Sequence, residues 1–353
     1  MKKQNTLLII LFLFLLLPFL FLIFNSGGEG YYGSLWDAIT LIVVNIGGIL
    51  LFLLTFQNTK SCSKNFFIYK LICLQEFFIM TGLLGSILGF ISLIIDMEVP
   101  PPPGVDPTAI TISNIALTIL CLIYGFTGAL ITYMIQKYHE MQSNDNYSSD
   151  IEKPKEGFKL FSLIYFLIYI SLNISTILYL SANSGSIIIL PFESIYYLAI
   201  ITIILILFYK GNSLFNLLKD LFWYIPDANN NIKYNLQFIR NVKKIFAMII
   251  CISLLCAPIM MLVVMTMPPQ EGNILDFNTL SFSGLKHGGI QFFWILSTII
   301  LLTIMEGREA TKLYYLTGKI SSGDRFYSIK YILGPAFLIF FIFIIGIIQS
   351  LLF

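Results

Sequence analysis

The chain of 353 residues is 57% hydrophobic and only 11% charged, and its mean hydropathy is +0.85. Soluble domains carry about 25% charged residues, so this composition excludes an ordinary soluble domain. The apolar residues form continuous blocks, which argues against a barrel of short alternating strands and favours helices that satisfy their own backbone hydrogen bonds. The net charge of +2 says little about partners, whereas the positions of the charges are informative.

The apolar blocks predict an all-α fold, a polytopic bundle of transmembrane helices. A block of about 20 apolar residues is long enough to cross the hydrocarbon layer as a helix. Nine such spans are predicted, roughly at 7–24, 35–56, 72–95, 110–135, 159–181, 187–208, 245–267, 288–305 and 331–352. The first block follows Lys2 and Lys3, so a signal peptide is the alternative there. The block is long for a signal peptide and no A-x-A site follows it, which favours an uncleaved span.

The basic residues indicate the orientation of the chain. With the N-terminus in the cytoplasm, the nine spans place every Lys and Arg except Lys286 in cytoplasmic segments, and the C-terminus lies outside. This is the positive-inside pattern, which a missed or invented span would scramble. No glycosylation sequon falls on the predicted outer face, which favours a bacterial inner membrane.

The order of the spans indicates a tandem duplication. Residues 1–140 hold four spans, 141–158 form a polar cytoplasmic linker, 159–320 hold four more, and 321–353 hold the ninth. Because four is even, both halves would have the same orientation, as in parallel repeats. In the second unit, 211–226 gathers leucines on one helical face. It is predicted to lie on the inner leaflet, with a short helix packed on a neighbouring loop as the alternative.

Small residues line the third and fourth spans. Gly82, Gly85 and Gly89 share one helical face of the third span, and the fourth carries a second stripe that includes Gly125 and Ala129. Such faces let helix backbones approach closely in a membrane. Plain helix packing explains them as well as an ion pathway does.

Residues 8–140 resemble the MotA/TolQ/ExbB family of ion-driven motor channel subunits. The segment Gly82–Gly89 matches the family's G-x-x-G-[TS]-hydrophobic-x-G pattern, and Tyr124-Gly125 with Ala129 matches its second helix. Asp37 and the pair Gly47-Gly48 echo the MotA branch. The chain carries Leu122 where the family has Thr. Its segment 57–70 replaces the large cytoplasmic domain of flagellar stators, so a flagellar stator is not expected. The second half would be a degenerate copy.

The resemblance implies a proton or sodium pathway in a homo-oligomer around a partner's single transmembrane helix, whose Asp carries the ion. Ser86 occupies the family's hydroxyl position, and Thr81 and Thr118 are the other candidate hydroxyls along the path. A hydroxyl passes an ion without the cost of a buried charge. Glu76 is either a proton relay at the cytoplasmic mouth or a carboxylate at the headgroup boundary. Glu306, at a predicted span end, is expected to be interfacial.

The sequence shows few motifs of other functional classes. No nucleotide loop, catalytic triad or metal-ligand spacing occurs, and the five cysteines suggest no disulfide framework, so neither an enzyme nor a cofactor is expected. The partners expected are the lipid bilayer, a second copy and the single-span protein, and not nucleic acid. Two alternatives remain: a self-contained small-molecule transporter of two parallel repeats, and a non-conducting membrane scaffold.

Overall fold

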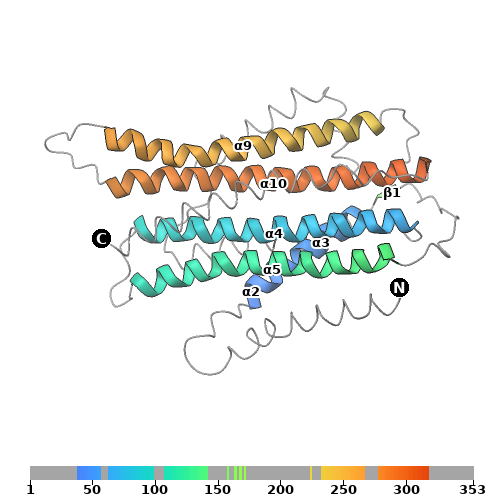
Figure 1. Cartoon of the computed structure of the whole chain (residues 1–353), viewed down its shortest axis with the longest axis horizontal. Helices are drawn as coiled ribbons and strands as arrows, with labels where there is room; N and C mark the ends of the chain where they lie inside the picture. The colour runs from blue at the N-terminus through green and yellow to red at the C-terminus, as the bar shows by residue number, and fades with distance from the viewer. Residues whose placement is uncertain are drawn as a thin grey trace.

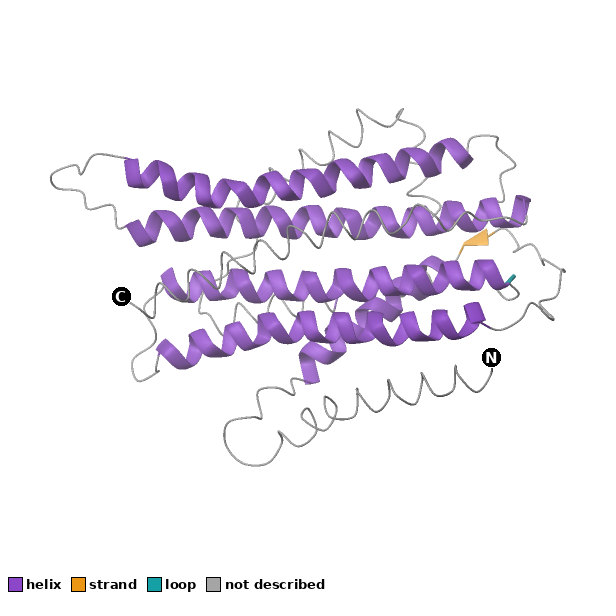
Figure 2. Cartoon of the chain, viewed as in Figure 1, coloured by secondary structure: helices purple, strands orange, loops and turns teal. Residues whose placement is uncertain are grey.

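The computed structural model describes residues 38–56, 63–98, 107–141, 157–158, 163–164, 167–168, 171, 223–224, 232–266 and 277–317. These residues are helical apart from Ser63, which is in a loop, and one short β pair (Figure 2). The helices are α2 (Ala38–Leu41), the π-helix η2 (Ile42–Ile46), α3 (Gly47–Phe56), α4 (Lys64–Glu98), α5 (Pro107–Met141), α9 (Ile232–Thr266) and α10 (Phe277–Thr317). The all-helical class predicted from the sequence is therefore confirmed for this part of the chain.

Two long helical hairpins make up the part of the bundle that the structure describes. Figure 1 shows the long helices side by side in the order α9, α10, α4, α5, with α10 packed against α4. The shorter α3 contacts both α4 and α10, so it lies across the junction of the hairpins. A helix of 35 residues, such as α4, is about 50 Å long, which exceeds a hydrocarbon layer of about 30 Å. The long helices would therefore project beyond a bilayer.

Two of the described helices are long and apolar enough to cross a membrane, over Lys64–Ile91 of α4 and Ile115–Met141 of α5. The predicted spans 35–56, 72–95, 110–135, 245–267 and 288–305 fall largely on helices. The spans 7–24, 187–208 and 331–352, and most of 159–181, lie outside the described residues. The count of nine spans and the duplication therefore stay predictions.

Three segments expected to be cytoplasmic loops are partly helical. Within 57–70, α4 begins at Lys64; within 209–244, α9 begins at Ile232; and α10 continues from Glu306 to Thr317. A hydropathy profile predicts the end of a span where charged residues appear. The helix itself continues when those charged side chains pair with residues of neighbouring helices. Lys243 and Glu306 form such a pair, with 2.9 Å between ammonium and carboxylate.

The expected amphipathic helix at 211–226 is wrong at its C-terminal end. Trp223–Tyr224 form strand β2, which pairs antiparallel with strand β1 (Gly157–Phe158) from the end of the predicted linker. Aromatic residues favour a pleated strand, and the pairing satisfies backbone groups of both segments. The rest of 211–226 lies outside the described residues.

An aromatic group packs where α3, α4 and α10 meet near the start of α4. Phe66 stacks on Tyr314 with 4.2 Å between ring centroids, and Phe56 meets both Phe66 and Tyr69 edge-on. The Ser63 N–H donates to the Tyr314 hydroxyl at 2.7 Å, which ties the start of α4 to the end of α10. These ring contacts hold the same end of the two hairpins together.

Candidate functional site: a buried charge cluster

The predicted glycine stripe is the contact between α4 and α5. A Cβ atom added to Gly82 would lie 2.8 Å from the Cys121 carbonyl oxygen and 2.9 Å from the Gly125 Cα, closer than real Cβ atoms come. At Gly89 it would lie 2.6 Å from the Thr118 hydroxyl. The two backbones therefore touch where the helices cross, as small-residue packing requires.

The other residues predicted for the ion pathway are buried along the same helices. Ser86 is 8% exposed, and Thr118, Tyr124 and Ala129 of α5 are 5%, 4% and 7% exposed. Gly85 lies against the Cys121 side chain, one turn from the Gly82 crossing. The structure thus brings these residues to one helix pair, and passage of an ion beside them stays a prediction.

Thr81 faces the π-helix. Its hydroxyl lies 3.0 Å from the Val44 carbonyl oxygen of η2 and 2.9 Å from the Phe77 carbonyl oxygen of its own helix. A π-turn displaces carbonyl groups from the regular i→i−4 pattern, so they accept hydrogen bonds from outside. The Thr81 hydroxyl therefore has a structural role, because it links α4 to η2.

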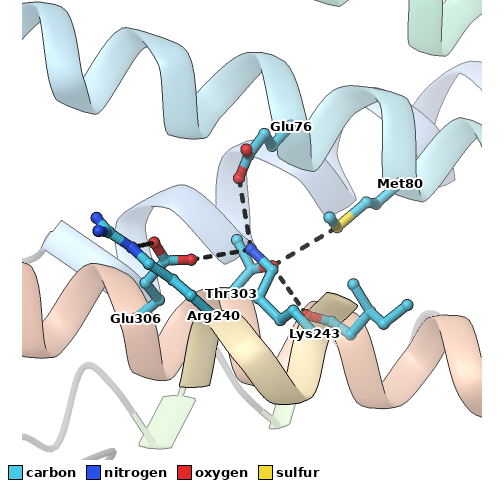
Figure 3. A network of polar contacts seen from close by, with 7 residues as sticks. Glu76, Met80, Arg240, Lys243, Thr303 and Glu306 are labelled. Carbon is cyan, nitrogen blue, oxygen red and sulfur yellow. Dashed lines mark hydrogen bonds and ion pairs between the residues drawn. The ribbon is translucent and has the colours of Figure 1, made fainter. Parts of the chain in front are cut away.

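Four charged side chains meet where α4, α9 and α10 adjoin (Figure 3). The Lys243 ammonium lies 2.9 Å from Glu306 Oε2 and 3.9 Å from Glu76 Oε2, and Arg240 Nε lies 2.9 Å from Glu306 Oε1. Exposure is 0% for the Glu76 side chain, 1% for Glu306 and 2% for Lys243. We call Glu76, Arg240, Lys243 and Glu306 the charge cluster.

The charge cluster is electrically balanced. Two carboxylates face one ammonium and one guanidinium, so the formal charges sum to zero. Burying an ion costs several kcal/mol unless a partner compensates it, and loss of one partner from a buried pair typically costs about 3–5 kcal/mol. The ionised form of each member therefore depends on the others.

Thr303 and Met80 lie beside the charge cluster (Figure 3). Thr303 of α10 donates its hydroxyl to the Ile299 carbonyl at 2.8 Å, and its oxygen lies 3.9 Å from the Met80 sulfur (Figure 3). Both side chains are buried. Among the described residues no three His, Cys, Asp or Glu side chains gather as a metal site.

A second polar ladder joins α4 to α5. Gln75 donates to Gln136 at 2.7 Å, and Gln136 donates to Glu140 at 2.6 Å, near the end of α5. Lys137 also pairs with Glu140 at 2.7 Å, but there the side chains are 42% and 32% exposed. The Lys137–Glu140 pair is partly exposed to solvent, whereas the charge cluster is buried, so this pair serves as the control in experiments on the cluster.

The sequence pointed to Glu76 but not to its partners. The structure buries Glu76 and Glu306 between the described helices, and their predicted positions relative to the membrane stay predictions. Arg240 and Lys243 were assigned to a loop. Their spacing of three residues puts both on one face of a helix, and this is the signal that could have paired them with a buried acid.

No family model, no curated protein and no solved structure matches this chain. The resemblance to the MotA/TolQ/ExbB family therefore stays a prediction from the sequence motifs alone.

Proposed function

We propose that this chain is a membrane subunit of a complex driven by a proton or sodium motive force, and that it lines the ion path together with a partner helix. The observation that carries the proposal is the complete burial of the Glu76 carboxylate within the apolar span of α4, with Lys243 shared between it and Glu306. Ionisable groups buried at membrane depth are costly and typically mark ion pathways or proton relays.

The proposal includes the arrangement that the sequence indicates. The chain spans a bacterial inner membrane nine times, with the N-terminus in the cytoplasm and the C-terminus outside. The partner is a single-span protein with an intramembrane Asp, and the complex holds several copies of this chain. The close α4–α5 contact at Gly82 and Gly125 supports a rigid wall for such a path.

Proton flux through the purified complex tests the proposal. The full chain, with whatever subunits remain bound to it, is reconstituted into liposomes that enclose a pH dye, and a potassium gradient with valinomycin sets the potential. In the wild type this potential should drive protons across the membrane. Glu76→Gln should reduce the proton flux at least about tenfold, which corresponds to about 1.4 kcal/mol of additional barrier.

The matched control is Glu140→Gln, which removes an equal charge from the partly exposed pair with Lys137. Its flux should equal that of the wild type. The same assay is repeated with a sodium dye. The proposal is refuted if the wild type carries neither protons nor sodium faster than empty liposomes do, or if Glu76→Gln conducts as the wild type does.

A self-contained transporter is the second candidate. The observation in its favour is that the charge cluster joins the two hairpins, since Glu76 lies on α4 whereas Lys243 and Glu306 lie on α9 and α10. A carboxylate supplied by the chain itself removes the need for a partner's acid. Full flux from the chain freed of all other subunits would favour this candidate.

A further inference from the structure

The charged residues of the long helices indicate where the bundle meets the lipid. We propose that the acyl chains of the bilayer surround a belt of the bundle whose cytoplasmic edge lies at the level of Glu76 and Glu306, and that they cover the outer face of α5 within this belt. The inference rests on the part of the proposed function that places the chain in a membrane, and it does not depend on conduction of an ion.

Helices α4 and α10 run antiparallel, and their contacts fix which residues lie at the same level. The Ser63 N–H donates to the Tyr314 hydroxyl at one end of the pair. Toward the other end, a Cβ atom on Gly289 would lie 3.0 Å from Ile91 Cγ1. Residue numbers therefore rise along α4 in the direction in which they fall along α10.

A run without charged residues separates two levels of this helix pair. Glu76 and Glu306 lie at one level, because both pair with Lys243. On α4, no Asp, Glu, Lys or Arg occurs between Glu76 and Asp96. On α10, none occurs between Lys286 and Glu306. Each run covers about 30 Å of helix, which equals the thickness of the hydrocarbon core of a bilayer. The two runs therefore match one hydrocarbon layer.

Further buried charged side chains lie beyond this layer, toward the predicted cytoplasmic ends of the helices. They are Lys70 of α4 and Arg308, Glu309 and Lys312 of α10. A charged side chain is costly at the centre of a bilayer, whereas near a helix end it reaches the interface. Burial of these charges is therefore least costly if this part of the bundle lies outside the hydrocarbon layer.

On α9 the exposed side chains change from polar to apolar at the level of the charge cluster. Gln237 and Asn241 are exposed, and both precede Lys243 in the chain. Ile245 and Met248 follow on the same helical face and are 37% and 51% exposed. Exposed amides favour water or headgroups, whereas exposed apolar side chains favour hydrocarbon. The edge of the lipid belt on α9 therefore lies between Asn241 and Ile245.

On α5 the corresponding change occurs at Gln136. Gln75 of α4, which is next to the charge cluster in sequence, donates to Gln136 at 2.7 Å and so fixes the level. On the cytoplasmic side of this level, the Lys137–Glu140 pair is partly exposed. On the other side, Ile135 and Ile131 are 44% and 47% exposed. The exposed side chains of two separate helices thus give the same edge.

Two tyrosines of α5 also mark this level. Tyr133 and Tyr138 are 39% and 45% exposed, and the Lys137 ammonium lies 5.5 Å from the centroid of the Tyr133 ring. Tyrosine is enriched at membrane interfaces, and a lysine there keeps its stem on apolar surface while its ammonium reaches water. This arrangement is typical of a helix at the point where it leaves the lipid.

The size of the side chains favours lipid over protein on the outer face of α5. The face that contacts α4 includes the small residues Cys121 and Gly125. The outer face carries Phe126, Leu130 and Ile131, which are 40%, 44% and 47% exposed. Helices that associate in a membrane use small residues to bring their backbones together. Large apolar side chains on the outer face fit acyl chains instead.

This position makes the charge cluster the cytoplasmic mouth of the proposed ion path and not a site at the midplane. The ends of α4, α9 and α10 then extend about 17 Å beyond the hydrocarbon layer. The remaining path of about 30 Å passes uncharged residues of the α4–α5 contact. Thr81, Ser86 and Thr118 lie along this stretch.

Nitroxide labels on added cysteines test the position of the edge. The full chain receives one cysteine at a time, at Gln237, Asn241, Ile245 or Met248, and is reconstituted in lipid. The signal of the unsubstituted chain, treated in the same way, is subtracted. Labels at Gln237→Cys and Asn241→Cys should collide with a water-soluble nickel chelate. Labels at Ile245→Cys and Met248→Cys should lose this accessibility and gain accessibility to oxygen, which concentrates in hydrocarbon.

A label at Leu130→Cys tests which molecule covers the outer face of α5. It should be mobile and accessible to oxygen. Thr132→Cys is the matched control, because Thr132 is 3% exposed on the same helix, and it should be accessible to neither reagent. An immobile label at Leu130→Cys that is broadened by a second label identifies a second copy of the chain. An immobile label without broadening identifies another subunit. Either result overturns lipid as the occupant.

The position of the edge is overturned if Asn241→Cys is accessible to oxygen and not to nickel, or if Met248→Cys is accessible to nickel. If a variant of α9 fails to insert into lipid, Ile131→Cys on α5 replaces it and should be accessible to oxygen alone. These labels report position whether or not the chain conducts. An edge at the charge cluster in a protein that carries neither ion refutes the proposed function alone. An edge elsewhere together with normal flux refutes this inference alone.

Discussion

Lys243 connects three helices through two carboxylates, and its removal should be severe. Lys243→Met leaves Glu76 without this cation and leaves Glu306 with Arg240. Loss of one partner from a buried pair typically costs about 3–5 kcal/mol, so we expect a decrease of this size in the free energy of unfolding. Denaturant titration of the protein in mild detergent measures it.

Two further variants separate charge from packing. Adding Glu76→Gln to Lys243→Met restores neutrality, so the double variant should be more stable than Lys243→Met alone. Lys137→Met removes an ammonium from the exposed pair with Glu140 and should cost at most about 1 kcal/mol. Equal losses from Lys137→Met and Lys243→Met would contradict the burial of the cluster.

Ser86 tests whether a buried hydroxyl serves conduction. The side chain is 8% exposed on α4, close to the glycines that contact α5. Ser86→Leu is expected to abolish ion-dependent function while the complex stays assembled. Because a larger side chain also costs about 1–3 kcal/mol of packing, Ser86→Ala isolates the hydroxyl.

In the reconstituted flux assay, Ser86→Ala should lower the rate, and its unfolding midpoint should match that of the wild type. Thr118→Val, on the facing helix, provides a comparison because it removes a hydroxyl and keeps the shape of the side chain. A normal flux in both Ser86 variants would remove this hydroxyl from the pathway.

At the scale of the helices, the contact between α4 and α5 should depend on the size of one side chain. Gly82→Ala puts a Cβ 2.8 Å from a backbone carbonyl of the facing helix, so the helices must separate. We expect a loss of about 1–3 kcal/mol, typical of overpacking. Leu130→Ala on the exposed face of α5, where the side chain is 44% exposed, is the control and should change stability little. A stability equal to wild type in Gly82→Ala would contradict the close crossing.

The sequence allowed the helices at 72–95 and 110–135 to be predicted because each is a long apolar run, and the facing glycines indicated that the two helices meet. It did not allow the ends of these helices to be predicted. Lys70 is only 7% exposed and packs over aromatic rings, so a charge that would end a span by hydropathy lies inside the bundle. Burial of Glu76 beside Lys243 depends on a contact between residues far apart in the chain, which no local pattern encodes.

For the whole molecule, the hairpin ends that hold Tyr138 and Tyr234 are predicted to face the cytoplasm. These side chains are 45% and 68% exposed, so cysteines placed there should react with water-soluble reagents. Tyr138→Cys and Tyr234→Cys should react with a membrane-impermeant maleimide in inverted vesicles and not in intact cells. Lys286→Cys, toward the opposite end of α10, should show the reverse. Labelling of all three from one side would refute the predicted orientation.

The π-helix at Ile42–Ile46 has a consequence for how α2 and α3 tolerate change in length. The Gly47 N–H lies within reach of both the Val43 and Val44 carbonyls at the end of this π-turn. A π-turn holds about one more residue per turn than an α-helix, so deletion of a single residue here would restore a regular α-helix and leave α2 and α3 in nearly the same rotational register. A deletion elsewhere in a helix rotates the segment before it by about 100°. The π-helix at Ile42–Ile46 is therefore the place where the chain can lose one residue without re-orienting α2 relative to α3.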